Sequence, residues 1–350
     1  MRSRTLSRLA LGAALAFGAS GLAPQKAQAQ EAEGDDAGVF SLIVENDSLS
    51  SGNDRNYTSG IKFTYVRPTG DIPGWLSGGE NLLRNLTGAE AQVWGVSFGQ
   101  SIFTPEDITA NPAPPDQHPY AGWLYLQAML GTVQHREDGL FPRFSDLYEL
   151  ELGMVGPAAM GEEAQSSIHQ LLGAPDPLGW DSQLENELAF ALSFERRWSS
   201  FRYSTDYVPG GLEFVAAPHI GATLGTLRTE ARVGLSAQIG YNIINQIEIG
   251  PPRVRPSIGS AGYFEEKPFS WSIFAGVQGR AVGRNLFLDG NTFVDSASVD
   301  KRTYVADAQL GFTLQVNGVR LAYTYVVRTE EFETQTERQD FGALALQFRL

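Results

Sequence analysis

Two polar segments of the sequence contain residues that could bind a cation or carry out acid–base chemistry. The first is the stretch "VENDSLSSGNDRNYTSGIKF" (44–63), whose two ends resemble β-strands. Its oxygen-bearing side chains include those of Asn46, Asp47, Asn53, Asp54 and Thr58. Such oxygens suit a hard cation such as calcium. A turn rich in Asn, Asp and Gly needs no metal, however, so an ordinary hairpin turn is the alternative.

The second segment, "EEAQSSIHQLL" (162–172), is predicted to form a short helix. Acidic residues begin it, and Gly173 and then Pro175 end it. Gln165 and His169 lie four residues apart and therefore share one helix face. The sequence has four histidines, which are His118, His135, His169 and His219. A single histidine is more often structural than catalytic, and the neighbouring Gln165 makes His169 the strongest candidate for chemistry.

The elements that must position these residues are β-strands, because apolar and polar residues alternate with a period of two. Four stretches show this most clearly: 147–154, 230–241, 270–280 and 341–350. In the first of them, Tyr148, Leu150 and Leu152 form an apolar face opposite Glu149 and Glu151. Phe274 is the exception in the third stretch, because it falls on the polar face.

This pattern favours a transmembrane β-barrel over a soluble all-β fold. The strands are long and their polar faces are rich in Gly and Gln, as in a barrel with apolar residues in lipid and polar residues in the lumen. We predict twelve strands, an even number that a closed antiparallel barrel of this kind requires. They are 39–47, 57–67, 91–103, 120–133, 145–156, 186–198, 212–224, 229–241, 268–282, 301–315, 318–332 and 338–350.

The first 29 residues are predicted to be a secretory signal peptide, and residues 30–350 a single barrel domain. Arg2, Arg4 and Arg8 precede an apolar run, and Ala27-Gln28-Ala29 resembles a cleavage site. The formal charge is −14, and loss of the four basic residues of the signal peptide makes it −18. So acidic a chain is not expected to bind nucleic acid. There are no cysteines, which excludes disulfides and thiol chemistry.

Four blocks resemble the signature segments of the outer-membrane lipid A 3′-O-deacylase family. They are "ENDSLSSGNDRNYTSG" (45–60), "PYAGWLYLQ" (119–127), "EEAQSSIHQLLG" (162–173) and "GWDSQLENE" (179–187), in the order found in the family. The resemblance implies a twelve-stranded barrel in the bacterial outer membrane. It also implies calcium-dependent hydrolysis of the ester that holds the 3′ acyloxyacyl group of lipid A. The partners would be lipopolysaccharide and outer-membrane lipid, and the protein would be a monomer.

The resemblance assigns roles to five residues. His169 would be the general base that activates water, while Asn46 and Asp47 would hold the calcium ion. Thr58 and Gln165 would position the substrate or neighbouring groups. The sequence departs from the family where His118 precedes "PYAG", since an arginine is expected there, and the loop after "SIFTP" has no matching lysine.

The rival hypothesis is a non-enzymatic barrel, either a porin or a structural protein. In that case Asn46, Asp47 and His169 would merely line a plugged lumen. The deacylase hypothesis instead requires Asp47, Thr58 and His169 to converge at one rim of the barrel, although they are far apart in sequence.

Overall fold

A computed structural model describes most of the chain, and all of the described residues belong to one compact unit, Asp36–Leu350. The described ranges are 37–49, 56–68, 72–134, 144–198, 201–204, 211–243 and 263–350. The predicted signal peptide, Asn53, Asp54 and His135 lie outside these ranges.

The strands are β1 (Val39–Asn46), β2 (Asn56–Pro68), β3 (Val93–Thr104), β4 (Ala121–Gln134), β5 (Phe144–Val155), β6 (Glu187–Trp198), β7 (Phe201–Ser204), β8 (Leu212–Leu224), β9 (Arg228–Tyr241), β10 (Lys267–Asn285), β11 (Tyr304–Asn317), β12 (Val319–Arg328) and β13 (Gln339–Arg349).

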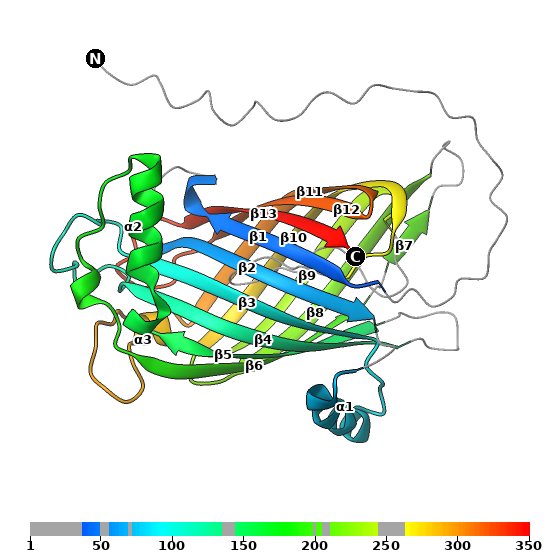
Figure 1. Cartoon of the computed structure of the whole chain (residues 1–350), viewed down its shortest axis with the longest axis horizontal. Helices are drawn as coiled ribbons and strands as arrows, with labels where there is room; N and C mark the ends of the chain where they lie inside the picture. Colours follow the sequence, from blue (N-terminus) through cyan, green and yellow to red (C-terminus); the bar gives the residue numbers. More distant parts are fainter. Residues whose placement is uncertain are drawn as a thin grey trace, which may run out of the picture. The chain divides into compact units, whose positions relative to one another are not determined.

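The strands form one closed antiparallel β-barrel (Figure 1). Neighbours in sequence pair with each other, β1 pairs with β13, and β6 pairs with β8. The short strand β7 continues β6 along the same partner, because Arg197 of β6 pairs with His219 and Phe201 of β7 pairs with Ala216. The barrel therefore has twelve strand positions, which confirms the predicted fold.

The predicted strand limits are wrong at three places around the last strands. β10 continues to Asn285 instead of ending at residue 282, β11 begins at Tyr304 instead of 301, and β12 ends at Arg328 instead of 332. Residues 301–303 lie outside the regular strand but keep isolated pairing, because Lys301 forms a β-bridge with Phe332 and the Thr303 carbonyl accepts from the Val282 N–H at 2.7 Å. Lys301 forms an ion pair with Asp289 at 2.7 Å, and the Arg302 N–H donates to the Glu331 carbonyl at 2.7 Å.

The two faces of the barrel agree with the alternation in the sequence. Leu150, Leu235 and Ile273 are exposed on the outer wall, by which we mean the membrane-facing surface of the strands, whereas Glu149 and Gln278 are buried in the lumen. Phe274 also points into the lumen, opposite Gly311. A Cβ atom at residue 311 would lie 2.3 Å from the Phe274 ring, so the glycine provides the space that this aromatic exception needs.

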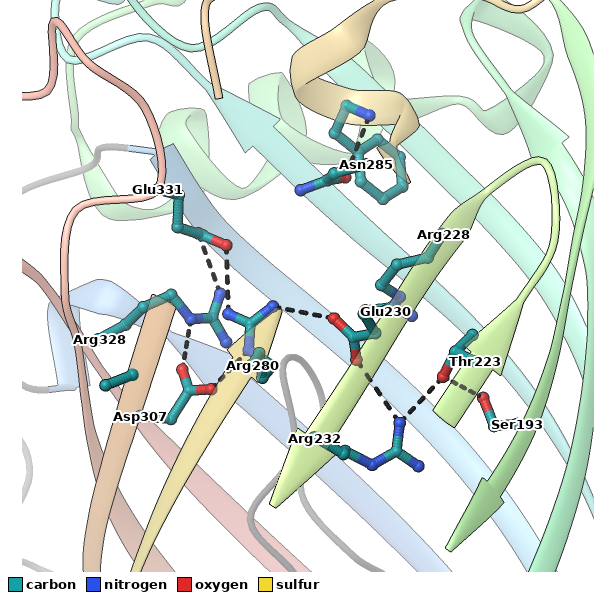
Figure 2. A network of polar contacts seen from close by, with 12 residues as sticks. Ser193, Thr223, Arg228, Glu230, Arg232, Arg280, Asn285, Asp307, Arg328 and Glu331 are labelled. Carbon is teal, nitrogen blue, oxygen red and sulfur yellow. Dashed lines mark hydrogen bonds and ion pairs between the residues drawn. The ribbon is translucent and has the colours of Figure 1, made fainter. Parts of the chain in front are cut away.

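A buried network of ion pairs runs along the lumen side of the neighbouring strands β9 to β12. Figure 2 shows Arg280 between three carboxylates: its Nε donates to Asp307 at 2.8 Å, and its other nitrogens reach Glu230 at 3.1 Å and Glu331 at 3.4 Å. Arg328 donates to the second oxygen of Asp307 at 2.7 Å. Because each of these buried charges has a partner of opposite sign, the network can occupy the lumen without leaving a desolvated charge unpaired.

An aromatic cluster also fills the lumen, around the end of β3. The ring of Phe103 stacks on Phe287 at 4.1 Å and on His118 at 5.4 Å between ring centroids. Tyr57 contacts both Phe103 and Phe341. These side chains are all buried, so this part of the lumen is packed with side chains.

Two longer helices lie at opposite ends of the barrel (Figure 1). The helix α2 (Gly161–Leu172) follows β5 at one end, which we call the α2 end, where α3 (Leu286–Asp289) also lies. The helix α1 (Gly74–Thr87) follows β2 at the other end, where the Leu350 N–H donates to the Gly38 carbonyl at 2.9 Å. We call this the terminal end. The sequence analysis did not predict α1. No helix among the described residues is long and apolar enough to cross a membrane.

Candidate functional site

The predicted helix that carries Gln165 and His169 is confirmed as α2. Glu162 and Glu163 occupy its first turn, where negative charge interacts favourably with the helix dipole. Gly173 ends the helix in a left-handed conformation, with φ of 69°. The Ala174 N–H then donates to the His169 carbonyl at 2.9 Å. This cap fixes the chain direction immediately after the histidine.

The helix α2 lies against the outer wall of the barrel and not in the lumen. Alternate residues of a strand point to opposite faces, so Gly122 of β4 faces outward like the exposed Leu126. A Cβ atom at Gly122 would lie 3.1 Å from both the Ala159 Cβ and the Gly161 nitrogen, so the start of α2 approaches β4 closely. From the neighbouring strand β3, the outward-facing Gln100 donates to the Ala159 carbonyl at 2.6 Å.

Gln165 is buried beneath the helix and its amide orientation is fixed. The indole N–H of Trp180 donates to Gln165 Oε1 at 2.9 Å. Trp180 in turn packs with Ile102 and Tyr120. Gln165 Nε2 has no hydrogen-bond partner among the described residues, although it is buried. An unsatisfied buried donor is costly, and such groups are concentrated at sites that bind or react.

His169 is buried one turn after Gln165, and one of its ring nitrogens is engaged. Its Nδ1 lies 2.6 Å from the Pro175 carbonyl oxygen, which can only accept a hydrogen bond. Nδ1 therefore carries the proton in the neutral ring, and Nε2 is the unprotonated nitrogen. This is the tautomer arrangement that a histidine base requires, with the ring held by a backbone acceptor.

The first polar segment is held to the ends of β2 and β3. Asn46 Nδ2 donates to the Thr58 carbonyl at 3.1 Å, and Thr58 Oγ1 lies 2.7 Å from Thr104 Oγ1. Asn46 lies two residues after the exposed Val44 in β1, so the two side chains point to the same, outward side of the strand. Thr104 lies two residues after Ile102 in β3 and likewise points outward. These side chains are thus anchored on the outer-wall side of the strand ends.

Asp47 begins the short 3-10 helix η1 (Asp47–Leu49), and its side chain is buried. At the other end of η1, Leu49 covers the outward-facing Gly342 of β13, where a Cβ atom would lie 2.7 Å from the Leu49 Cβ. The hydroxyl of Tyr323 donates to the Leu49 carbonyl at 3.1 Å. The segment after β1 therefore folds over the outer wall, as α2 does.

The two polar segments lie at the same end of the barrel, and each is connected to the end of β3. In the ladder Asn46 pairs with Ser59, and Ser59 pairs with Ile102. Ile102 packs against Trp180, which holds Gln165, and Thr104 lies two residues further along the same strand. The structure thus brings Asn46 and Thr58 together and places Gln165 and His169 over the adjacent strand.

Trp180, Thr104 and Pro175 were not singled out from the sequence, although each one orients a predicted site residue. Trp180 is part of the "GWDSQLENE" block, and Pro175 was noted only as a helix stop. No local pattern relates Thr104 to Thr58, because the contact arises at an irregularity in the β2–β3 ladder, where Thr104 pairs with Asn56 and Thr58 has no ladder partner.

The donors near Asn46 suit calcium in kind. Asp47 is a buried carboxylate, and amide, hydroxyl and backbone oxygens surround it in sequence. Among the described residues there is no group of three or more acids, histidines or cysteines that could hold a metal. Calcium accepts amide and water oxygens beside a carboxylate, so Asn46 and Asp47 fit such an ion in type.

The other two described histidines have structural contacts. His219 is a lumen residue as expected, with Nε2 3.1 Å from Gln278 Oε1. His118 is buried against Phe103, and its Nδ1 lies 2.7 Å from the Pro119 carbonyl. Burial lowers the pKa of His118, and the nearby Glu331 opposes that effect only in part.

Comparison with known proteins agrees with this architecture. The family described as "Outer membrane protein LpxR" matches residues 11–350. The chain belongs to the LpxR family of outer membrane proteins. Its structure is similar to that of LpxR from Salmonella typhimurium, with a TM-score of 0.66 and 19% sequence identity over 89% of this chain and 100% of that one.

Similarity to other barrels is weaker. The NanC porin matches with a TM-score of 0.35 at 6% identity, over 89% of this chain and 100% of that one. The β domain of the Bordetella autotransporter BrkA matches with a TM-score of 0.42 at 9% identity, over 90% of this chain and 100% of that one. No curated protein matches the sequence. Membership of the LpxR family confirms the predicted family and supports the outer-membrane location.

Proposed function

We propose that this LpxR family member is a calcium-dependent hydrolase that removes the 3′-linked acyloxyacyl group from lipid A. The observation that carries the proposal is His169, whose ring is held by the Pro175 carbonyl in a helix on the outer wall. A histidine on the outer wall lies beside membrane lipid, whereas a histidine in the lumen would be separated from lipid by the strands. The family resemblance of the two polar segments supplies the substrate class.

His169 acts as the general base in this mechanism. Its Nε2 accepts a proton from a water molecule while the water oxygen attacks the ester carbonyl. The tetrahedral intermediate then collapses, and the same proton passes to the departing 3′ oxygen. The products are the acyloxyacyl carboxylic acid and lipid A with a free 3′ hydroxyl. No serine nucleophile is needed.

Gln165 and Thr58 position the reacting groups. Trp180 holds the Gln165 amide so that Nε2 remains a donor for the substrate or the attacking water. Thr104 holds the Thr58 hydroxyl in the same way from the neighbouring strand. Asn46 and Asp47 would hold calcium, which when bound polarises the ester carbonyl and stabilises negative charge on its oxygen.

The orientation of the barrel agrees with this substrate. Outer-membrane barrels have short periplasmic turns and longer extracellular loops. The length of the α2 segment and the presence of the α3 segment support an assignment of the α2 end to the outside of the cell, in the leaflet that contains lipid A. Because the site lies on the outer wall, the ester can enter sideways from that leaflet.

Mass spectrometry of lipid A tests the proposal. We expect cells that express the wild type to lose the 3′ acyloxyacyl group, and cells that express His169→Gln to retain it. Gln170→Ala is the matched control, because Gln170 is the next residue of α2 and is exposed. Purified wild type should lose its activity in a calcium chelator and recover it when calcium is restored.

The porin or structural alternative predicts a different result. Lipid A would be unchanged in all three strains, and the purified protein would leave other acyl esters intact with or without calcium. If His169→Gln were as active as the wild type, the assignment of the base would be wrong even if the enzyme were real.

A further inference from the structure

The helix α1 at the terminal end has two apolar rows that point in different directions. The first row, Leu76 and Leu83, is buried. The second row, Trp75, Leu82 and Leu86, is 63%, 59% and 76% exposed. At 3.6 residues per turn the two rows lie about a quarter of a turn apart around the helix axis.

The buried row packs on the outer wall of the barrel. Leu76 lies in a cluster with Trp94 of β3 and Leu130 of β4, and Tyr65 of β2 packs against this cluster. Trp94 and Leu130 pair across the ladder and have the outward parity of the exposed Phe98 and Leu126. The helix therefore covers the outer wall at Trp94 and Leu130, whereas Phe98 and Leu126 of the same strands remain exposed on that wall.

The remaining face of α1 is polar and nearly neutral. It carries Ser77, Asn81 and Asn85 together with an ion pair between Arg84 and Glu80 at 3.1 Å. Going around the helix, the faces are thus wall, exposed apolar row and polar side. A helix has this arrangement of faces when it lies in the plane of a membrane–water interface, with its apolar residues among lipids.

We propose that α1 is an interfacial anchor whose Trp75, Leu82 and Leu86 insert among phospholipids at the terminal end of the barrel. The occupant is lipid because the exposed row continues from the lipid-facing wall of β3 and β4. Tryptophan suits this depth, since its ring is apolar and its N–H can reach water. Because Arg84 and Glu80 neutralise each other, the insertion does not depend on anionic headgroups.

The anchor would fix how deep the barrel sits and, through the rigid strands, the height of the α2 end in the opposite leaflet. This inference is independent of the proposed reaction, because it concerns the other end of the barrel. It rests only on the barrel spanning a membrane.

The absence of cysteine from the sequence allows a direct test. Leu86→Cys and, as the matched control on the polar side, Asn81→Cys are each labelled with a small environment-sensitive fluorophore in the full chain. The proteins are reconstituted in phosphatidylethanolamine–phosphatidylglycerol vesicles, and the label is quenched with brominated phospholipid or with aqueous iodide. We expect brominated lipid to quench the label at 86 at least threefold more than the label at 81, and iodide to show the reverse order.

Equal quenching of the two labels by iodide would overturn the proposal. A second result would also overturn it. If the label at residue 86 were shielded from both quenchers at a high protein-to-lipid ratio, and this shielding disappeared on dilution with lipid, a second copy of the protein would be covering the row. The lipid quenching should remain when phosphatidylglycerol is omitted, and its loss would contradict the charge-independent insertion.

Discussion

The helices α1 and α2 both pack on the outer wall of the same barrel, at opposite ends, yet they bury different chemistry. The buried face of α1 is leucine: Leu76 packs with Trp94, and Leu83 is also buried. The buried positions of α2 include Gln165 and His169. In α1 the apolar row continues around the helix into the membrane, whereas in α2 the buried polar groups are oriented by Trp180 and Pro175.

The difference shows how one structural arrangement serves two purposes. Burial of leucine against a wall needs shape and area, and each side chain contributes through the hydrophobic effect. Burial of an amide and an imidazole is costly unless specific partners are in place. The α2 end retains that cost at Gln165 Nε2, which in the proposed reaction is a donor positioned beside the His169 base.

The largest effect is expected from moving α2 away from the wall. Gly122→Val would add a branched side chain where even a single added Cβ atom would lie only 3.1 Å from Ala159 and Gly161. The start of α2 must shift, and misplacement of a catalytic group by about 1 Å can reduce the rate about 100-fold. The measurement is the rate of lipid A deacylation by purified protein in the presence of calcium.

The matched control for this change is Gly79→Ala in α1. A Cβ atom there would meet Leu130 at an ordinary 3.7 Å, so the helix can stay in place. Both variants should retain the shift in gel mobility on heating that is typical of folded barrels. Full activity in Gly122→Val would mean that close contact between α2 and β4 is not needed for the reaction.

An intermediate effect is expected when the support of Gln165 is altered. Gln165→Glu keeps an acceptor for Trp180 but removes the donor, and loss of one such donor costs about 100-fold in kcat. The shift in Gly122→Val should cost more, because it displaces Gln165 and His169 together. Trp180→Phe removes only the hydrogen bond that orients the amide, a loss of about 1 kcal/mol or about fivefold in rate. Steady-state kinetics on a lipid A analogue would separate the two variants. Equal and small losses would indicate that the amide donor does not act in the reaction.

The smallest effect concerns pH, and it distinguishes the two ends. Burial lowers the pKa of His118 from its ordinary value of 6.5. When the α2 end opens and exposes the imidazole, the ring binds a proton more readily, so protonation favours the open state. The α2 end therefore becomes less stable as pH falls below about 6.5. The equilibrium constant for opening rises by up to about tenfold per pH unit. The nearby Glu331 has a pKa held below its ordinary 4.5, because Arg328 and Arg280 outweigh the effect of its burial, and it contributes only at lower pH.

Hydrogen exchange between pH 7 and 5.5, corrected for intrinsic rates, would measure this difference. We expect protection to fall in residues 105–120 of the wild type and to stay constant in α1, where leucines make the contact with the wall. His118→Gln should remove the dependence. A similar fall at both ends would mean that global unfolding, and not the buried histidine, responds to acid.

The sequence by itself determined the barrel and its strands. Period-two alternation depends only on which residues face lipid and which face the lumen, so stretches such as 230–241 could be assigned without knowledge of their neighbours. The limits around residues 301–303 and the helix α1 were missed. In α1, Gly78 and Gly79 weaken the helix signal, and contact with Trp94 and Leu130 stabilises the helix from outside the segment.

The site was only half determined by sequence. Residue types, and the spacing of Gln165 and His169 on one helix face, could be recognised along the chain, because helix geometry is local. The pairing of β2 with β3, including its irregularity, decided that Asn46 and Thr58 lie beside Thr104, and packing alone put α2 over β3 and β4 on the lipid side. Contacts between segments that are distant in sequence depend on closure of the whole barrel, and no local pattern of residues encodes them.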